Sequence, residues 1–439
     1  MVRINGMAQD IFWPSRRAVL AGLGASTMVA AAPAAAERSP RALRARPGLL
    51  ALRAGAADTP VWSLGGDSLL FKQGERAEIA FANELPVPMV LNCRGLDGAV
   101  AVEPLISRVP VAQGASETLH LPLRHAGTSW CDLALLGDGA ARPTRGLPLI
   151  VAEREPVSVD RDEILLIEEW RLRADGTAIV PGMNPGDARP TYTLNGNATL
   201  ELKLRANERL RIRFISAVER NVIALKIEGY DCMVMALDGQ PAEPLLARGG
   251  LVLAPGARAD VFVDAKDKPP GTSSSILLHD GQEARPVGRL IVSDDPPIRT
   301  MVLPPARALP SNGLPDRLDL KSALRADLSI GAEQPDWVLP TKFDATAAPA
   351  FHARVGRTVV LALANRAGIA ASFHLHGHHF RLLDRLDDGW KPFWLDTVAI
   401  DAGQTHRIAF LAEYAGRWLI ESVASDWTAP RLLRWYSVE

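Results

Sequence analysis

The chain has 439 residues, enough for two to four domains that each bury a core of their own. Its 49 Lys and Arg residues balance 50 Asp and Glu residues, so no charge excess marks a nucleic-acid-binding or membrane-surface protein. Thirty-three prolines and 35 glycines interrupt short apolar runs, which favours β-sandwiches over helices.

The N-terminal segment has the pattern of an export signal. Residues 15–20 read SRRAVL, a twin-arginine pattern, and an alanine-rich run follows from Ala18 to about Ala36. Residues 34–36 offer a small-residue cleavage site, which makes residues 1–36 a signal peptide. The alternative is a membrane anchor, since the run is about as long as a membrane span, but alanine and glycine make it weakly apolar. We therefore predict twin-arginine export and a periplasmic mature protein without a membrane span.

Three segments along the chain resemble one another and predict strands. Residues 75–81 and 208–214 alternate charged and apolar side chains, and residues 356–361 are a more apolar version. With the Pro and Gly punctuation between them, these segments predict three domains, at residues 45–153, 156–293 and 319–439. The proline-rich residues 294–318 are predicted to be the linker before the third domain.

Three cysteines remain in this plan: Cys93, Cys131 and Cys232. The first two lie at matching places of the first domain, and the periplasm permits disulfides. The sequence leaves two interpretations open, which are a bridge between Cys93 and Cys131 and three small buried side chains.

The most informative segment lies near the C-terminus. Residues 373–380 read FHLHGHHF and hold four of the nine histidines. His374, His376 and His378 alternate, so a strand would place them on one face. Because neutral imidazole is the commonest metal ligand, a copper or zinc site is the first hypothesis.

The first and third domains align without gaps around this segment. Asn83 precedes residues 92–95, which read NCRG, by nine positions, and Asn365 precedes residues 374–377, which read HLHG, by the same spacing. Glycines on both sides keep this register further along. The matched pairs are Asn92 with His374, Arg94 with His376, Asp132 with Glu421, and Ala134 with Val423. We expect the two domains to present equivalent strands that face one another.

With these motifs the chain resembles the multicopper oxidase family. The motifs are residues 374–378 (HLHGH), 396–398 (DTV), 237–239 (LDG) and 255–261 (PGARADV), and the likeness covers nearly all of the mature chain. The resemblance implies an all-β protein of three cupredoxin-like Greek-key β-sandwich domains. It also implies a mononuclear copper in the third domain and a trinuclear copper cluster between the first and third.

Most of the copper ligands that the resemblance implies are replaced in this chain. His374 and His376 are retained. The replaced positions are Asn92, Arg94, Asp132, Ala134, Ala371, Glu421, Ser422, Val423 and Trp427. A blue-copper centre needs a thiolate and two imidazoles, and the hydroxyl of Ser422 is not deprotonated at neutral pH. We therefore predict no catalytic residues, no copper cofactor and no reduction of oxygen by this chain.

Six side chains are expected to converge at the replaced cluster: Asn92, Arg94, Asp132, His374, His376 and Glu421. Buried polar groups need partners, so the first interpretation is an ion-pair network around Arg94. The alternative is a single metal, either copper or another divalent ion such as zinc or non-haem iron, on His374 and His376 with Asp132 or Glu421. The charge of Arg94 argues against that ion. His378 and His379 are interpreted as satisfied core or surface residues, with a ligand role as the alternative. The remaining histidines are interpreted as structural: His120, His125, His279, His352 and His406.

The first functional hypothesis is a copper-free periplasmic binding or scaffold protein with a protein partner and no nucleic acid. The resemblance extends to a copper-free periplasmic cell-division protein of the family, which implies a role in cell division or envelope stress. An oxidoreductase with a reduced metal site at His374 and His376 is the second hypothesis. An inactive subunit beside a copper-bearing partner is the third.

Overall fold

The computed structural model describes residues 39–53, 55–266, 268–331, 336–384 and 389–439. Residues Pro40–Glu439 form one compact unit. The predicted signal peptide at residues 1–36 lies outside the described residues. Across the described ranges, no helix is long and apolar enough to cross a membrane.

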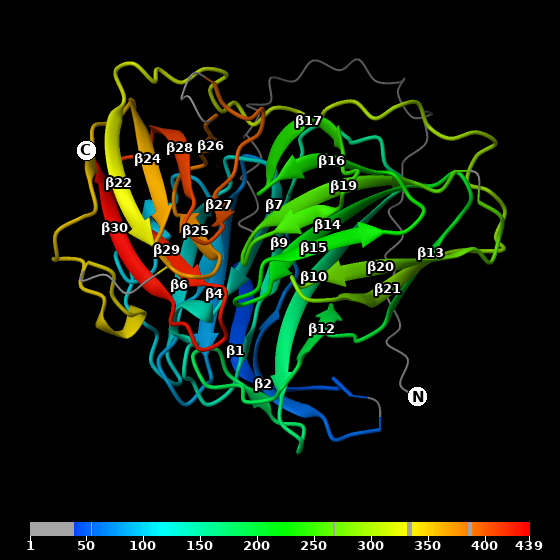
Figure 1. The fold of residues 1–439 in the computed structure, drawn as a ribbon, viewed down its shortest axis with the longest axis horizontal. Coiled ribbons are helices and arrows are strands. Elements are labelled where there is room, and N and C mark those ends of the chain that lie inside the picture. Colours follow the sequence, from blue (N-terminus) through cyan, green and yellow to red (C-terminus); the bar gives the residue numbers. More distant parts are fainter. Residues whose placement is uncertain (1–38, 54, 267, 332–335, 385–388) are drawn as a thin grey trace, which may run out of the picture. The chain divides into compact units, whose positions relative to one another are not determined.

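The described residues form three pairs of β-sheets, whose strands group by colour along the chain in Figure 1. In the first pair, one sheet has the order β6 (Ser116–Pro122), β4 (Arg76–Asn83), β1 (Arg41–Leu50), β2 (Thr59–Gly66) and β8 (Thr144–Arg145). The second sheet of this pair has the order β3 (Leu69–Lys72), β9 (Leu147–Ala152), β7 (Gly127–Asp132) and β5 (Asn92–Arg94).

The second pair of sheets spans residues 161–292. One sheet has the order β11 (Ala178–Ile179), β10 (Arg161–Leu172), β14 (Arg209–Ala217), β19 (Arg258–Asp264), β16 (Cys232–Leu237) and β17 (Gln240–Leu246), with β12 (Pro190–Leu194) paired to β10. The other sheet has the order β13 (Leu200–Leu204), β21 (Ala284–Val292), β20 (Ser273–His279), β15 (Ile223–Ile227) and β18 (Leu251–Leu253).

The third pair spans residues 324–438. One sheet has the order β22 (Leu324–Ile330), β24 (Arg357–Asn365), β28 (Thr405–Ala412) and β26 (Arg381–Leu382). The other has the order β23 (His352–Ala353), β30 (Leu432–Val438), β29 (Gly416–Ala424), β25 (Ala371–Leu375) and β27 (Thr397–Ile400). Short 3₁₀ turns complete the described elements: η1 (Val100–Val102), η2 (Ala134–Leu136) and η3 (Pro340–Lys342).

All three pairs share one strand plan. The opening strand of each pair, β1, β10 or β22, lies parallel to β4, β14 or β24, which in turn pairs antiparallel with β6, β19 or β28. The repeated segments of the sequence are therefore β4, β14 and β24, because the same strand recurs at the same place in each sandwich. The prediction of an all-β, three-sandwich fold is confirmed.

Each pair of sheets encloses its own apolar core. Leu43 and Leu149, from facing sheets, belong to the first core, Leu165 and Ile276 to the second, and Val359 and Phe373 to the third. Strand β4 shows why, since its residues alternate between buried and exposed along the strand. The first pair begins at Arg41, four residues before the expected boundary at 45, and residues 294–318, all described, contain no strand. The domain boundaries themselves stay predictions.

Candidate functional site

The candidate site is built from two equivalent strand pairs, β5 with β7 and β25 with β29. Asn92 lies opposite Asp132 in the first pair, and His374 lies opposite Glu421 in the second. These are the positions that the sequence spacing matched. Because side chains alternate along a strand, Arg94 and His376 lie on the same faces as Asn92 and His374.

Arg94 is the centre of a buried ion-pair network. Its Nε lies 2.6 Å from Asp132 Oδ2, and its Nη1 lies 2.9 Å from Glu421 Oε1. Glu421 also lies 2.6 Å from Arg431 Nη1 and 3.4 Å from Asn92 Nδ2. The Arg94 side chain is only 3% exposed. Although burial alone would raise the pKa of Glu421, Arg94 and Arg431 hold it well below its ordinary value.

His376 is held as a cation at the edge of this network. Its Nε2 lies 2.8 Å from Glu421 Oε1, and its Nδ1 lies 2.9 Å from Glu103 Oε1. Burial alone would lower the pKa of His376, but the charge of Glu103, supported by Glu421, raises it to about 9. Both ring nitrogens therefore donate to carboxylates, so neither offers a lone pair to a metal.

His374 lies two residues earlier, within β25, and differs from His376 in its charge. Its Nδ1 lies 2.8 Å from Thr397 Oγ1 and 3.4 Å from Asp396 Oδ1. Burial lowers its pKa to about 4, because Asp396 only partly offsets the loss of water. His374 is therefore neutral at pH 7.

Asp396 raises the pKa of His374 only in part, because the Asp396 carboxylate is already paired with another residue. Arg258 binds both Asp396 oxygens at 2.7 Å, a bidentate pair that is fully buried. The same guanidinium donates to the carbonyl oxygens of Thr128, Asp238 and Gly256. Arg258 thus joins strands of all three pairs of sheets beside the site.

The resemblance places the mononuclear copper at Ala371, Ser422 and Trp427, and all three residues are buried. Val423 and Ala134, which stand at two further ligand positions, are also buried. Within the described part of the chain, Ser422 Oγ has no hydrogen-bond partner. Trp427 Nε1 donates to Val180 O at 3.1 Å. No strong metal donor replaces the ligands that the family has at these positions.

These residues do not fit a copper cluster. A cavity of about 20 Å³ borders Arg94, Glu103, His374, His376 and Asp396, which is room for about one water molecule. A guanidinium and an imidazolium point into this place, and both would repel metal ions. The geometry therefore forms a polar junction between the first and third pairs of sheets.

The sequence missed several members of this network. Asp396 and Arg258 belong to the DTV and PGARADV motifs, so those motifs were a signal that they lie near the site. Glu103 and Arg431 stand in no motif, and only the fold brings them to His376 and Glu421.

The structure also answers three other expectations. His378 is a satisfied core residue, because its Nδ1 lies 2.7 Å from the Tyr436 hydroxyl and its Nε2 accepts from the Tyr414 amide. Cys93 and Cys131 lie directly opposite on β5 and β7, with their Sγ atoms 2.7 Å apart, and the structure has both as thiols. His125, which the sequence predicted to be a single structural residue, lies together with Asp97 and His379.

The charge states of the site predict a pH dependence. The folded pKa of His376 is about 9 against an ordinary value of 6.5, so its contribution to stability is complete below pH 6.5 and is lost as the pH rises through 9. We expect the free energy of unfolding to fall between pH 7 and 9, by up to about 1.4 kcal/mol per pH unit for this group.

Urea unfolding at several pH values checks this expectation. The His376→Gln variant is expected to show a shallower fall than the wild type over that range. His120→Gln, which changes an exposed histidine, is the control and should follow the wild type. Parallel curves for His376→Gln and the wild type would contradict the assignment of charge to His376.

Three cupredoxin-like sandwiches, with a buried polar site between the first and third, define the class of the multicopper oxidases. Family models described as multicopper oxidase match residues 164–273 and 315–439, together more than half of the chain. The chain belongs to the multicopper oxidase family.

Solved structures of this family share the fold. A multicopper oxidase from Pseudomonas thermotolerans superposes with a TM-score of 0.78 at 24% identity, covering 91% of this chain and 98% of the other. Lac15 from a marine microbial metagenome superposes with a TM-score of 0.74 at 25% identity, covering 91% of this chain and all of the other.

Curated relatives are similar at lower coverage. Laccase-12 of Oryza sativa subsp. japonica is 24% identical over 242 residues, which cover 48% of this chain and 40% of the laccase. The cell division protein FtsP of Haemophilus influenzae is 24% identical over 228 residues, which cover 48% of each chain. The chain thus spans less than half the length of the curated relatives that it matches.

Proposed function

We propose that this chain is a copper-free member of the family that binds protein partners in the periplasm and oxidises no substrate. One observation carries the proposal. The Arg94 guanidinium, ion-paired to Asp132 and Glu421, stands where the family places ligands of its trinuclear cluster. A cation that is already buried and neutralised there leaves neither the lone pairs nor the charge balance that copper ions need.

Two further observations support the biological setting. The relative FtsP is named a cell division protein, so a role in cell division or envelope stress is part of the proposal. The twin-arginine pattern at residues 15–20 supports export to the periplasm, where such a partner would be met.

Metal content tests the copper-free state. We expect the mature protein, expressed by its own export route with added copper, to hold far less than one copper ion per chain. Phenol oxidation should equal the buffer rate, while a laccase run in parallel gives turnover. Stoichiometric copper, blue absorption or a paramagnetic copper signal would overturn the proposal.

A deletion strain tests the function. Loss of the gene is expected to produce filaments or poor growth under envelope stress. Complementation should be equally effective in copper-replete and copper-depleted medium, because the protein acts without the metal. Rescue that requires copper, or normal division and growth of the deletion strain under stress, would count against a copper-free role in the envelope.

The alternative of a reduced metal site has one observation in its favour. Ligand atoms of His374, His376 and Glu421 lie within 4.8 Å of one another. Zinc or iron bound there in proportion to the chain, with turnover of a substrate, would favour this alternative. Purification of the chain from its native periplasm shows whether a copper-bearing partner co-purifies with it.

A further inference from the structure

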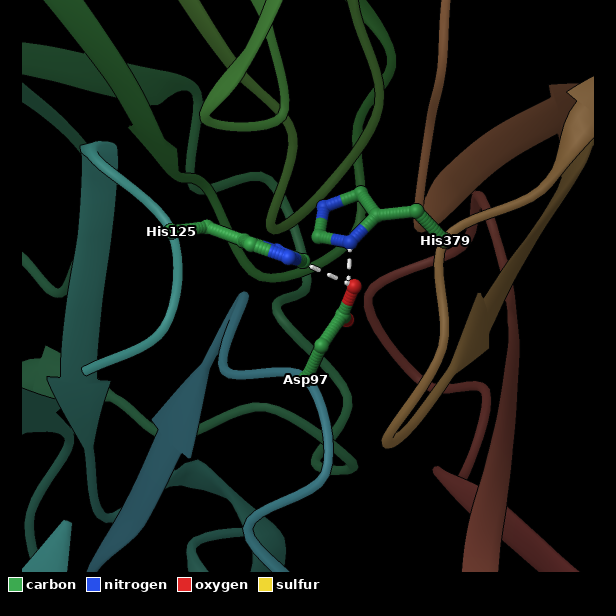
Figure 2. A group of neighbouring side chains, drawn as sticks. All are labelled: Asp97, His125 and His379. Carbon is green, nitrogen blue, oxygen red and sulfur yellow. Dashed lines mark hydrogen bonds and ion pairs between the residues drawn. The ribbon is translucent and has the colours of Figure 1, made fainter. Parts of the chain in front are cut away.

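A second group of metal-binding side chains lies outside the Arg94 network. It consists of Asp97 after β5, His125 between β6 and β7, and His379 after β25 (Figure 2). One ligand atom from each residue lies within 4.8 Å of the others. None of the three positions matches a copper-ligand position that the resemblance implies, so this group is a separate feature of the molecule.

The distances suit a metal ion that joins the three side chains. His379 Nδ1 lies 2.8 Å from Asp97 Oδ1, and His125 Nδ1 lies 3.3 Å from Asp97 Oδ2. Two ligand atoms at about 2.0 Å from a tetrahedral zinc lie about 3.3 Å apart. Figure 2 shows both rings pointing a nitrogen at the carboxylate.

The hydrogen bonds around His125 leave two acceptors facing each other. Asn312 is oriented by Ala126, because its Oδ1 accepts from the Ala126 amide and its Nδ2 donates to the Ala126 carbonyl. Asn312 Nδ2 also donates to Gln240 Oε1, so Gln240 presents its NH₂ group to His125 Nδ1 at 3.0 Å. The same NH₂ group lies 3.4 Å from His379 Nδ1. His125 Nδ1 must then be an acceptor, and an ion that binds there takes the lone pair that now accepts from Gln240.

The second of the two facing acceptors is an oxygen of Asp97. Asp97 is 95% buried, and its Oδ2 has no hydrogen-bond partner among the described residues. A buried carboxylate oxygen is costly when it has no donor and lies 3.3 Å from an imidazole nitrogen that carries no proton, unless a cation binds both. This unpartnered oxygen is the observation that points to a missing ligand.

His379 has the outer contact that is typical of a metal-bound histidine. Its Nε2 lies 2.8 Å from the carbonyl oxygen of Asp238 and donates to it, which leaves Nδ1 as the nitrogen that faces Asp97. A backbone carbonyl on the far ring nitrogen orients the imidazole and selects the tautomer that a metal binds.

The surroundings leave room for a fourth ligand and a route of entry. A cavity of about 10 Å³ borders Asp97 and His379, close to the volume that one water molecule needs. The His125 side chain is 11% exposed, so an ion can reach the group from its side. Three protein ligands and one water complete four-coordinate zinc.

We propose that Asp97, His125 and His379 bind one zinc ion. Two imidazoles and a carboxylate also suit iron(II), but the usual order of affinities places zinc above iron for a given set of ligands. Copper(II) stands above zinc in that order but prefers a square-planar or tetragonal site, whereas three side chains and one water suit tetrahedral zinc. On binding, the ion takes the place of the proton that His379 Nδ1 shares with Asp97, and this proton leaves to solvent. The ion links the first pair of sheets to the third, beside Asp238 of the second.

Zinc titration of the mature chain tests this site. After removal of metals with EDTA, calorimetric titration with zinc chloride is expected to show about one ion per chain and a rise in Tm. Cobalt(II) should give the visible absorption of a four-coordinate site with nitrogen and oxygen ligands. The His125→Gln variant should bind zinc about tenfold or more weakly.

Two control variants separate this site from other histidines. His120→Gln changes an exposed histidine and should leave zinc affinity unchanged. His374→Gln removes a member of the other candidate group and should also leave it unchanged. Zinc binding that survives His125→Gln but is lost in His374→Gln would overturn the proposal, as would the absence of zinc binding and of any Tm change in the wild type. The zinc titration and the Tm measurement of the wild type do not depend on whether a variant folds.

Discussion

Replacement of Arg94 by alanine is expected to lower the free energy of unfolding by about 3–5 kcal/mol. The change removes the guanidinium that neutralises Asp132 and Glu421, and both carboxylates are 3% exposed. Glu421 keeps Arg431 and His376, whereas Asp132 loses a 2.6 Å charged hydrogen bond and stays buried. Unfolding in urea, followed by tryptophan fluorescence, measures the loss.

Two further variants serve as controls for the loss of stability in Arg94→Ala. Arg44→Ala removes a pair with Glu84 whose side chains are 58% and 42% exposed, and should change stability by about 0–1 kcal/mol. The double variant Arg94→Met with Asp132→Leu removes the stranded carboxylate as well, so it should recover part of the loss. An Arg94→Ala loss as small as that of Arg44→Ala would show that the network adds little to the fold.

Replacement of Gly377 by alanine is expected to lower the free energy of unfolding by about 2–5 kcal/mol. Gly377 has φ +75°, and an added Cβ would lie 2.2 Å from Cε3 of Trp418. The Trp418 ring is fully buried, and its Nε1 donates to Tyr414 O, so it has little freedom to move. The loss of stability has two sources, which are the overlap of the new methyl group with the ring and the strain of a left-handed backbone at a residue with a Cβ.

Gly356→Ala is the matched control for the backbone term. Gly356 has φ +77°, and none of the described residues lies within 4 Å of an added Cβ. Its replacement should cost about 1–2 kcal/mol, the backbone cost alone. Equal losses in the two variants would show that Trp418 yields to the new methyl group and that contact with the ring is not the reason for glycine in this motif.

The part of the site that could be predicted from the sequence is the part that repeats. Asn92 and His374, or Asp132 and Glu421, occupy equivalent strand positions because the same sandwich recurs, and strand register places them opposite their partners. Contacts between residues that have no equivalent in another sandwich leave no such signal in the sequence. Asp97 and His379 are 282 residues apart, so no spacing rule relates them.

The sequence by itself determined which donor atoms exist. A serine stands where the thiolate would be and an arginine where an imidazole would be, and the chemistry of those groups does not depend on the fold. Only the tertiary structure decided the charge of the two retained histidines. His374 lies in β25 and His376 follows directly after its end, yet the pKa of His374 is lowered to about 4 and that of His376 is raised to about 9. The reason is that two carboxylates, Glu103 and Glu421, contact the two ring nitrogens of His376. His374 has one carboxylate beside it, Asp396, and Arg258 already neutralises that carboxylate.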